Sequence, residues 1–281
     1  MQKLKMVALD LDGTLLTDKK EITKKTLETL KRAARTGTEI VIATGRSVDG
    51  IPAEMDEIPE YTYAVTCNGS AVYNIKTREP IYEDLMEWEE MKDLFHELWS
   101  LDVIVDAFVG THIYRDRKNI EPTRQLPVSQ AVRDFLLASR EDVDHLDRMM
   151  EEKRMAVNKF SLNFKSNPDG TLKDRDKVME IASRYPEFVA VSGGSNNVEF
   201  TRASATKGTA LIKLGEYLHI KKEEIMACGD SGNDMDMLSK VGFPVAMANA
   251  EPQILEICDY VTLSNEEDGV AAVLEKFVLE K

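Results

Sequence analysis

Short apolar runs alternate with segments of helical periodicity near the start of the chain. Runs rich in apolar and β-branched residues at 5–9, 39–43 and 63–66 predict strands that are buried on both faces. Between the first two runs, apolar residues recur at helical spacing over 22–35, and Gly37 follows as a helix terminator. This alternation of strand and helix is typical of a parallel α/β sheet.

The end of the chain repeats this order. The same criteria predict strands at 225–228, 243–247 and 260–263, and helices at 207–218, 235–240 and 269–278. We therefore expect residues 1–84 and 201–281 to fold together as one Rossmann-like α/β domain with a parallel sheet.

The middle of the chain has a different character. Predicted helices alternate there with strand-like runs that lack the order of a parallel sheet: helices at 88–101, 128–138 and 175–185, and strands at 103–109, 159–164, 189–192 and 197–201. Residues 192–195 predict a hairpin turn. Residues 85–200 are therefore expected to form an α+β domain inserted into the first one.

Polar residues follow four of the predicted parallel strands. They are Asp10 and Asp12 after 5–9, Thr44, Gly45 and Arg46 after 39–43, Asn68 and Gly69 after 63–66, and Asp230 after 225–228. Parallel strands bring their carboxyl ends to one edge of the sheet, where ligands bind in such folds. We expect these residues to form one site.

Carboxylates dominate this expected site. Asp10 and Asp12 are two residues apart, so an extended backbone sends both side chains to the same side, where Asp230 and Asp234 could face them. Two carboxylates about 4 Å apart repel by roughly 4 kcal/mol at an effective dielectric constant near 20. Such a cluster needs a cation or bound protons. The carboxylates offer only oxygen ligands, and such a ligand set favours Mg²⁺ over zinc.

Carboxylates beside Mg²⁺ suit phosphoryl transfer. One carboxylate can attack phosphorus, and a second can protonate the leaving oxygen and later deprotonate water. Thr44 can donate a hydrogen bond to the phosphoryl group, and Lys207 begins a predicted helix whose free N–H groups also attract phosphate. Taken one by one, these residues have structural alternatives: Asp-Gly as a turn, Ser231 or Asn233 as a helix cap, and Arg46 and Lys207 as solvated side chains.

Four motifs in this order resemble the haloacid dehalogenase superfamily of Mg²⁺-dependent phosphotransferases, and within it the Cof-type phosphatases of subfamily IIB. The motifs are residues 10–16, 44–46, 204–208 and 229–234, and residues 66–70 and 245–250 add two Cof-like segments. The resemblance covers essentially the whole chain. It implies that the insert is a cap domain of type C2B, which selects the substrate and is hinged near 74–84 and 201–207.

The resemblance also implies a role for each motif residue. Asp10 is the nucleophile that forms an aspartyl-phosphate, and Asp12 is the general acid and base. The remaining implied roles are phosphate or substrate binding by Thr44, Gly45, Arg46, Asn233 and Lys207, and Mg²⁺ binding by Asp10, Asp12 (through its backbone carbonyl), Asp230 and Asp234, with Asn233 completing the shell.

Charge and composition limit the partners. Acidic residues number 50 against 36 basic ones, so the net charge is −14. Such a chain repels nucleic acid and anionic membranes, which leaves a small phosphorylated metabolite as the expected partner. No apolar run is long enough to span a bilayer, and three widely spaced cysteines fit a reducing cytoplasm.

Three functions remain open. A hydrolase of phosphomonoesters is favoured, because an acid two residues from the nucleophile serves a leaving group that needs a proton, and the family resemblance implies sugar phosphates as its substrates. A phosphomutase would pass the phosphoryl group to a second sugar hydroxyl, and a non-catalytic sensor would only bind. Specificity residues and oligomeric state are not predicted; residues 112–118, Asn163, Asn196 and Asn197 are undecided, with 112–118 favoured as a solvated turn.

Overall fold

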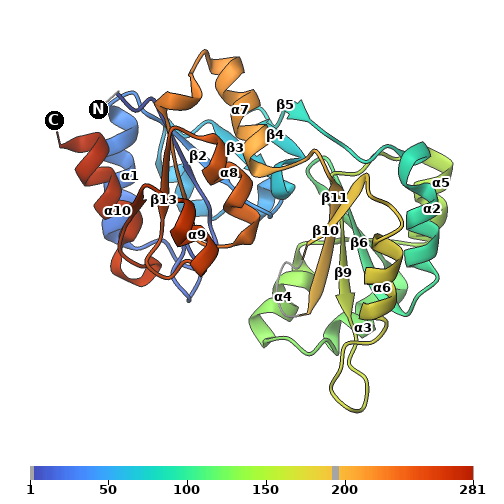
Figure 1. Cartoon of the computed structure of the whole chain (residues 1–281). Helices are drawn as coiled ribbons and strands as arrows, with labels where there is room; N and C mark the ends of the chain where they lie inside the picture. The colour runs from blue at the N-terminus through green and yellow to red at the C-terminus, as the bar shows by residue number, and fades with distance from the viewer. Residues whose placement is uncertain (1–2, 192–195, 281) are drawn as a thin grey trace. The chain divides into compact units, whose positions relative to one another are not determined.

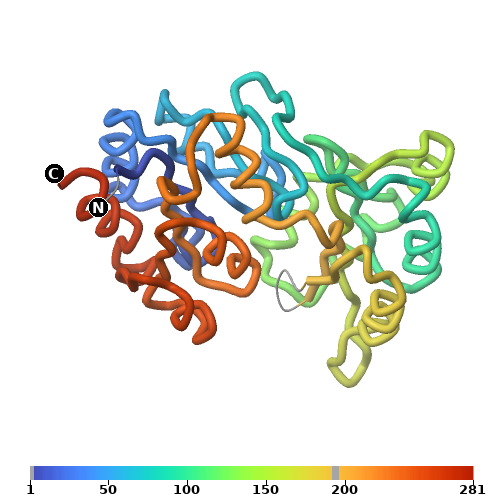
Figure 2. Tube along the Cα trace, turned by 45° about the horizontal axis from the view of Figure 1, so that its top comes forward, coloured from blue at the N-terminus to red at the C-terminus, as the bar shows by residue number. Residues whose placement is uncertain are grey.

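The chain folds into two compact units. The computed structural model describes residues 3–191 and 196–280, so the predicted hairpin turn at 192–195 lies outside the described residues. The core unit comprises Met1–Glu83 and Ala205–Lys281, and the insert unit comprises Asp84–Ser204. Figures 1 and 2 show that the blue start and the red end of the chain make up the core unit, and that the green and yellow middle makes up the insert unit. In the described parts of the chain, no helix combines the length and apolarity needed to cross a membrane.

The core unit is built on an eight-stranded sheet with the order β14-β13-β12-β1-β2-β3-β4-β5. The strands are β1 (Met6–Leu9), β2 (Glu39–Ala43), β3 (Tyr63–Thr66), β4 (Ala71–Asn74), β5 (Pro80–Glu83), β12 (Ile225–Gly229), β13 (Phe243–Ala246) and β14 (Tyr260–Val261). The strands from β14 to β3 are parallel, and Met6 of the central strand pairs with both Ile225 and Glu39. The predicted α/β class with a parallel core is confirmed.

Helices cover both faces of this sheet. The helices are α1 (Lys24–Arg35), α7 (Lys207–Leu218), α8 (Met235–Lys240), α9 (Pro252–Ile257) and α10 (Gly269–Leu274). Leu30 of α1 and Val273 of α10 pack on one face, while Leu211 of α7 and Leu238 of α8 pack on the other (Figure 1). Alternate residues of β1 enter each of the two cores, which explains why the whole strand is apolar.

One prediction for the core unit is wrong. The hinge expected near 74–84 implies a linker without regular structure, but Pro80–Glu83 form β5, which pairs antiparallel with β4 at the sheet edge. This strand is half-exposed and contains a proline, so it lacks the apolar run that marks the central strands.

The insert unit has a six-stranded sheet with the order β10-β11-β9-β6-β7-β8. Its strands are β6 (Val103–Val109), β7 (His112–Asp116), β8 (Glu141–Val143), β9 (Lys159–Phe164), β10 (Phe188–Val191) and β11 (Asn197–Arg202), and its helices are α2 (Trp88–Trp99), α3 (Ile120–Arg124), α4 (Gln130–Ala138), α5 (Leu146–Lys153) and α6 (Arg175–Ala182). Phe95 of α2 stacks on Phe160 of β9 at 5.3 Å between ring centroids. Together with α5 and α6, α2 covers one face of the sheet, and Leu136 of α4 packs against Ile104 on the other.

The favoured interpretation of residues 112–118 as a solvated turn is wrong. His112–Asp116 form β7, and Arg115 within it is buried and pairs with Asp142 at 2.7 Å. Beside this pair, Arg140 and Asp106 form a second buried ion pair at 3.0 Å. Both pairs depend on partners about 30 residues away, which the local charge pattern does not reveal.

Packing predicts that two leucines of the core unit contribute very differently to the free energy of unfolding. Leu30 of α1 is fully buried, whereas Leu255 of α9 is 36% exposed. We expect Leu30→Ala to lower the free energy of unfolding by about 2–5 kcal/mol, because it removes buried methyl groups and leaves a cavity. Leu255→Ala, the matched control, should cost about 1 kcal/mol at most. Guanidinium unfolding followed by circular dichroism measures both, and equal losses would contradict the packing described for α1.

Candidate active site

The four polar strand ends meet at one edge of the core sheet. The backbone N–H of Asp10, just after β1, donates to the carbonyl of Cys228 in β12 at 3.1 Å. The N–H of Thr44, just after β2, donates to the carbonyl of Val65 in β3 at 2.9 Å. Because β1 also pairs with β2, all four strands deliver their carboxyl ends to adjacent positions, as the sequence predicts.

Three carboxylates and one ammonium form the centre of this edge. One carboxylate oxygen each from Asp10, Asp230 and Asp234 lie within 4.8 Å of one another, and we call these residues the carboxylate cluster. The Nζ atom of Lys207 lies 2.6 Å from Oδ1 of Asp10 and 2.7 Å from Oδ1 of Asp234. Lys207 is only 1% exposed, so its charge depends on these two partners.

The loop after β12 holds Asp234 in place. Its Oδ2 accepts hydrogen bonds from the backbone N–H groups of Asp230 and Ser231, at 3.0 and 3.2 Å. Its other oxygen is thereby turned toward Lys207. The position before Asp230 must be glycine, since a Cβ on Gly229 would lie 2.6 Å from the Cβ of Asp234.

The loop after β1 is fitted to Asp230. The hydroxyl of Thr14 donates to Oδ1 of Asp230 at 2.8 Å. Gly13 has φ +92°, and a Cβ there would lie 2.4 Å from Oδ2 of the same carboxylate. The Gly-Thr pair of the first motif therefore positions a carboxylate that lies more than 200 residues away in the sequence.

Helix α7 begins with Lys207, and its first turn is fixed from two sides. Thr206 caps the helix by accepting the N–H of Thr209 at 3.0 Å, and its hydroxyl donates to Asp236 of α8. On the other side, Gly69 has φ +101°, and a Cβ there would lie 2.1 Å from the Thr206 carbonyl. A side chain at Gly69 would displace the start of α7 and move Lys207 away from the cluster.

Burial and mutual repulsion shift the titration of the cluster. Burial raises the pKa of Asp10 to about 8, against the opposing charge of Lys207 and with further repulsion from Asp234. Burial also raises the pKa of Asp230 to about 6, although the hydrogen bond from Thr14 opposes this. Burial disfavours the charged form of Lys207, but the charges of Asp10 and Asp234 outweigh it and raise its pKa above the usual value. The cluster therefore retains protons near neutral pH when only Lys207 balances it.

Asp12 lies in a different electrostatic environment. Arg46 donates to both of its oxygens, from Nε at 2.9 Å and from Nη2 at 2.7 Å, and Nζ of Lys20 lies 2.7 Å from Oδ1. Burial acts to raise the pKa of Asp12, but the Arg46 and Lys20 interactions outweigh it, so the pKa is lowered. The surroundings of these two neighbouring aspartates therefore shift their pKa values in opposite directions.

The other predicted site residues lie at the same edge. Thr44 is buried, and its Oγ1 accepts the N–H of Arg46 at 3.1 Å. A Cβ on Gly45 would lie 2.6 Å from Oδ1 of Asn68, so this backbone passes close to the loop after β3. Asn233 is exposed, and its Oδ1 accepts the hydroxyl of Ser231 within the turn that also carries Asp234.

Two site residues had no predicted role. Lys20 reaches Asp12 from a turn in which it adopts a left-handed backbone with φ +65°. Asn249 donates from Nδ2 to the Gly13 carbonyl at 2.8 Å and so ties the 245–250 segment to the first motif. The family-like residues around Asn249 were a usable signal, whereas the pattern around Lys20 contains none.

The carboxylate cluster fits a divalent cation. Three carboxylates against one ammonium leave two negative charges when all are ionised, and the donor atoms are hard oxygens of the kind that Mg²⁺ prefers. Burial is the main cause of the raised pKa values of Asp10 and Asp230, and repulsion from Asp234 adds to it, so a bound cation would favour the ionised form of both. The side chain of Asp12 accepts hydrogen bonds from Arg46 and Lys20, so Asp12 could reach a cation here only through its backbone.

Comparisons with known proteins identify the family of the chain. Residues 7–274 match the family model described as haloacid dehalogenase-like hydrolase. The chain is 30% identical over 281 residues to the putative phosphatase YxeH of Bacillus subtilis, covering 99% of both chains. It is 27% identical to a 5-amino-6-(5-phospho-D-ribitylamino)uracil phosphatase, YwtE, of the same organism, with 98% of both covered. The solved structure of the subclass IIB sugar phosphatase BT4131 has the same fold, with a TM-score of 0.76, 23% identity, and coverage of 97% of this chain and 98% of that one.

The family and enzyme class predicted from the four motifs are confirmed at this level. The relatives bear phosphatase names, and the similarity covers nearly the whole length on both sides. The chain belongs to the haloacid dehalogenase-like hydrolases, as a member of their phosphatase branch.

Proposed function

We propose that this protein is a Mg²⁺-dependent phosphomonoester hydrolase that acts on small phosphorylated metabolites, sugar phosphates among them, through an aspartyl-phosphate on Asp10. The observation that carries the proposal is the position of Asp10. Its carboxylate is buried and bound by Lys207, and it lies within 4.8 Å of the other two carboxylates of the cluster. Asp12 follows two residues later and is ionised in a different environment.

In the first half-reaction, Asp10 attacks phosphorus while the bond between phosphorus and the ester oxygen breaks. Asp12 gives a proton to the departing oxygen, which leaves as an alcohol. To act as this acid, Asp12 must first take up a proton, and the contacts of Arg46 and Lys20 must loosen because both favour its charged form. A phosphate dianion attracts both cations and so provides the reason for that loosening.

In the second half-reaction, water attacks phosphorus and the bond between Asp10 and phosphorus breaks. Asp12, which is now ionised and acts as the base, takes the proton of that water, and inorganic phosphate leaves. Lys207 holds the same Asp10 oxygen throughout and compensates the developing negative charge. Asp10, Asp230 and Asp234 would hold Mg²⁺, which would supply positive charge that favours the ionised form of Asp10 and stabilises negative charge on the phosphoryl group.

The substrate class rests on chemistry and on relatives. Asp12 serves a leaving group that needs a proton, which an ester of a sugar or polyol does. One relative is named for a substrate with a phosphorylated ribityl chain, and one neighbouring fold for sugar phosphates. Release of inorganic phosphate, rather than conversion of one hexose phosphate into another, would separate the hydrolase from a mutase.

Asp10→Asn should abolish turnover of p-nitrophenyl phosphate. The amide keeps an oxygen that accepts from Lys207 but is a far weaker nucleophile, so we expect a loss of at least about 10⁴-fold with the fold intact. Asp56→Asn, at an exposed aspartate of the core unit, is the matched control and should retain activity. Wild-type hydrolysis by Asp10→Asn would refute the assignment of the nucleophile.

Asp12→Asn should discriminate between leaving groups. For sugar phosphates, which need a protonated leaving oxygen, we expect the rate to fall by about 10²–10⁴-fold. For p-nitrophenyl phosphate the leaving group needs little protonation, so its first half-reaction should lose much less. Single-turnover measurement of the two substrates tests this, and equal losses in that step would exclude an acid role for Asp12.

Mg²⁺ binding should strengthen as the pH rises. Protons compete with Mg²⁺ for carboxylates whose pKa values are raised to about 8 and about 6 in the absence of the ion. The stabilisation that Mg²⁺ adds should therefore be small at pH 5 and largest above pH 8, as measured by the shift in Tm with added MgCl₂. EDTA should also stop turnover. A Tm shift that is independent of pH, or is retained in Asp230→Asn, would contradict the proposed ligands.

A further inference from the structure

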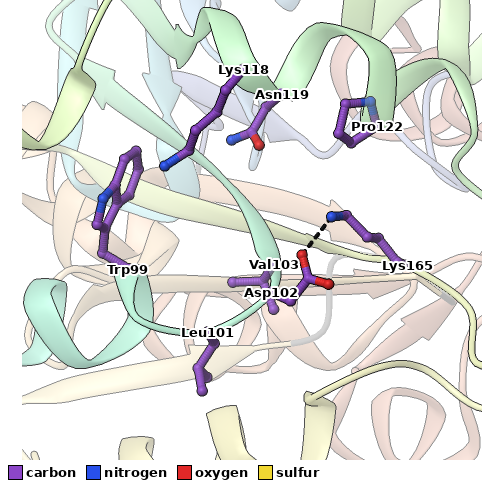
Figure 3. Close-up of a pocket in the computed structure, with 8 residues that line it drawn as sticks. All are labelled: Trp99, Leu101, Asp102, Val103, Lys118, Asn119, Pro122 and Lys165. Carbon is purple, nitrogen blue, oxygen red and sulfur yellow. Dashed lines mark hydrogen bonds and ion pairs between the residues drawn. The ribbon is translucent and has the colours of Figure 1, made fainter.

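The insert unit contains a hollow that the proposed reaction does not use. It has a volume of about 240 Å³, and its lining residues, all from the insert unit, are Trp99, Leu101, Asp102, Val103, Lys118, Asn119, Pro122 and Lys165 (Figure 3). It lies where β6 begins and β9 ends, since Val103 pairs with Phe164. The chain enters and leaves the insert unit at the other end of this sheet, near Met86, which pairs with Val157, and after Arg202.

Positive charge exceeds negative charge around this hollow. Lys165 and Lys173 both bind the carboxylate of Asp102, and Asp174 accepts the Asp102 N–H while pairing with Lys177. Of the charged side chains that line the hollow itself, Lys118 and Lys165 face Asp102, which leaves one positive charge in a chain of net charge −14. An excess of this sign is a local exception and attracts anions.

Lys118 is the cation that is free to bind a ligand. Its Nζ lies 3.9 Å from the centroid of the Trp99 ring, and among the described residues it makes no ion pair with a carboxylate. A cation–π contact at an exposed site is weaker than a charge-assisted hydrogen bond to an anion. An anion in the hollow can therefore draw the ammonium off the ring.

Asn119 supplies a second, independent indication. The residue is 6% exposed and lines the hollow, yet its Nδ2 has no hydrogen-bond partner among the described residues. An unpaired buried amide is costly, and a ligand that accepts its hydrogen bond would remove that cost. Figure 3 shows the polar ends of Lys118 and Asn119 on one side of the hollow and the ammonium of Lys165 on the other.

We propose that this hollow is a second anion site, which binds the phosphate group of a small metabolite or inorganic phosphate between Lys118, Asn119 and Lys165, beside Trp99. Three donors that approach from different directions suit the three oxygens of a tetrahedral phosphate better than the two coplanar oxygens of a carboxylate. The volume accommodates a phosphate with a small organic group attached.

Trp99 provides a local test. The chain has two tryptophans, and Trp88 is buried in the insert core, so Trp88→Phe leaves Trp99 as the sole reporter in the full-length protein. We expect its emission to change saturably on titration with inorganic phosphate at constant ionic strength. The phosphonate isostere of glucose 6-phosphate, which cannot be hydrolysed, distinguishes an esterified ligand from free phosphate.

Variants locate the binding. Lys118→Met in this background should weaken binding roughly tenfold or more, because it removes a charged donor. Asn119→Asp, which keeps the shape but adds a negative charge, should also weaken it, and Lys153→Met, at an exposed lysine of α5, should leave it unchanged. Far-UV circular dichroism confirms that each variant is folded.

Three results would overturn the proposal. They are the absence of a saturable change with either probe, the same change with sodium chloride alone, and unaltered binding in folded Lys118→Met. The last would mean that Trp99 senses phosphate bound elsewhere, including at the carboxylate cluster.

Discussion

A buried ammonium shared by two carboxylates organises the core unit. Lys207 contacts Asp10 and Asp234 at 2.6 and 2.7 Å, and none of the three side chains is appreciably exposed. A buried charge without partners is strongly destabilising, so the ends of β1 and β12 and the start of α7 must come together for any of the three to be tolerated. The glycines that allow this close approach are therefore as necessary as the charged groups.

This arrangement leaves a deficit of positive charge at the site. One lysine opposes three carboxylates, and burial together with their mutual repulsion raises the pKa values of Asp10 and Asp230. If lysines balanced all three carboxylates, the metal-free site would be stable and would have little affinity for a cation. The deficit instead would favour binding of a cation, and a bound cation would attract a phosphate dianion despite the net charge of −14.

In the insert unit, most buried charged side chains have a partner of opposite charge. Its buried ion pairs, such as Arg115 with Asp142 and Arg140 with Asp106, are matched one to one and stabilise the sheet. Around the hollow beside Trp99 the matching fails, with an excess of lysine and an unpaired amide. The excess of positive charge and the buried Asn119 amide that line the same hollow are the basis for proposing that an anion binds there.

The sequence alone determined the parallel core and the residue types at its carboxyl edge. The apolar runs at β1, β2, β3 and β12 predict these strands from their own residues alone. Parallel pairing then brings the polar residues at their carboxyl ends together, independently of the segments that connect the strands. Only the tertiary structure decided which atoms meet. Lys207 and Asp10 are 197 residues apart, Lys20 reaches Asp12 through a left-handed turn, and the edge strand β5 owes its existence to a partner rather than to its own pattern. The spacing of apolar residues indicates which face of a helix or strand is buried. The contacts between distant residues depend instead on strand register and on how the chain connects the elements, and no short stretch of sequence contains that information.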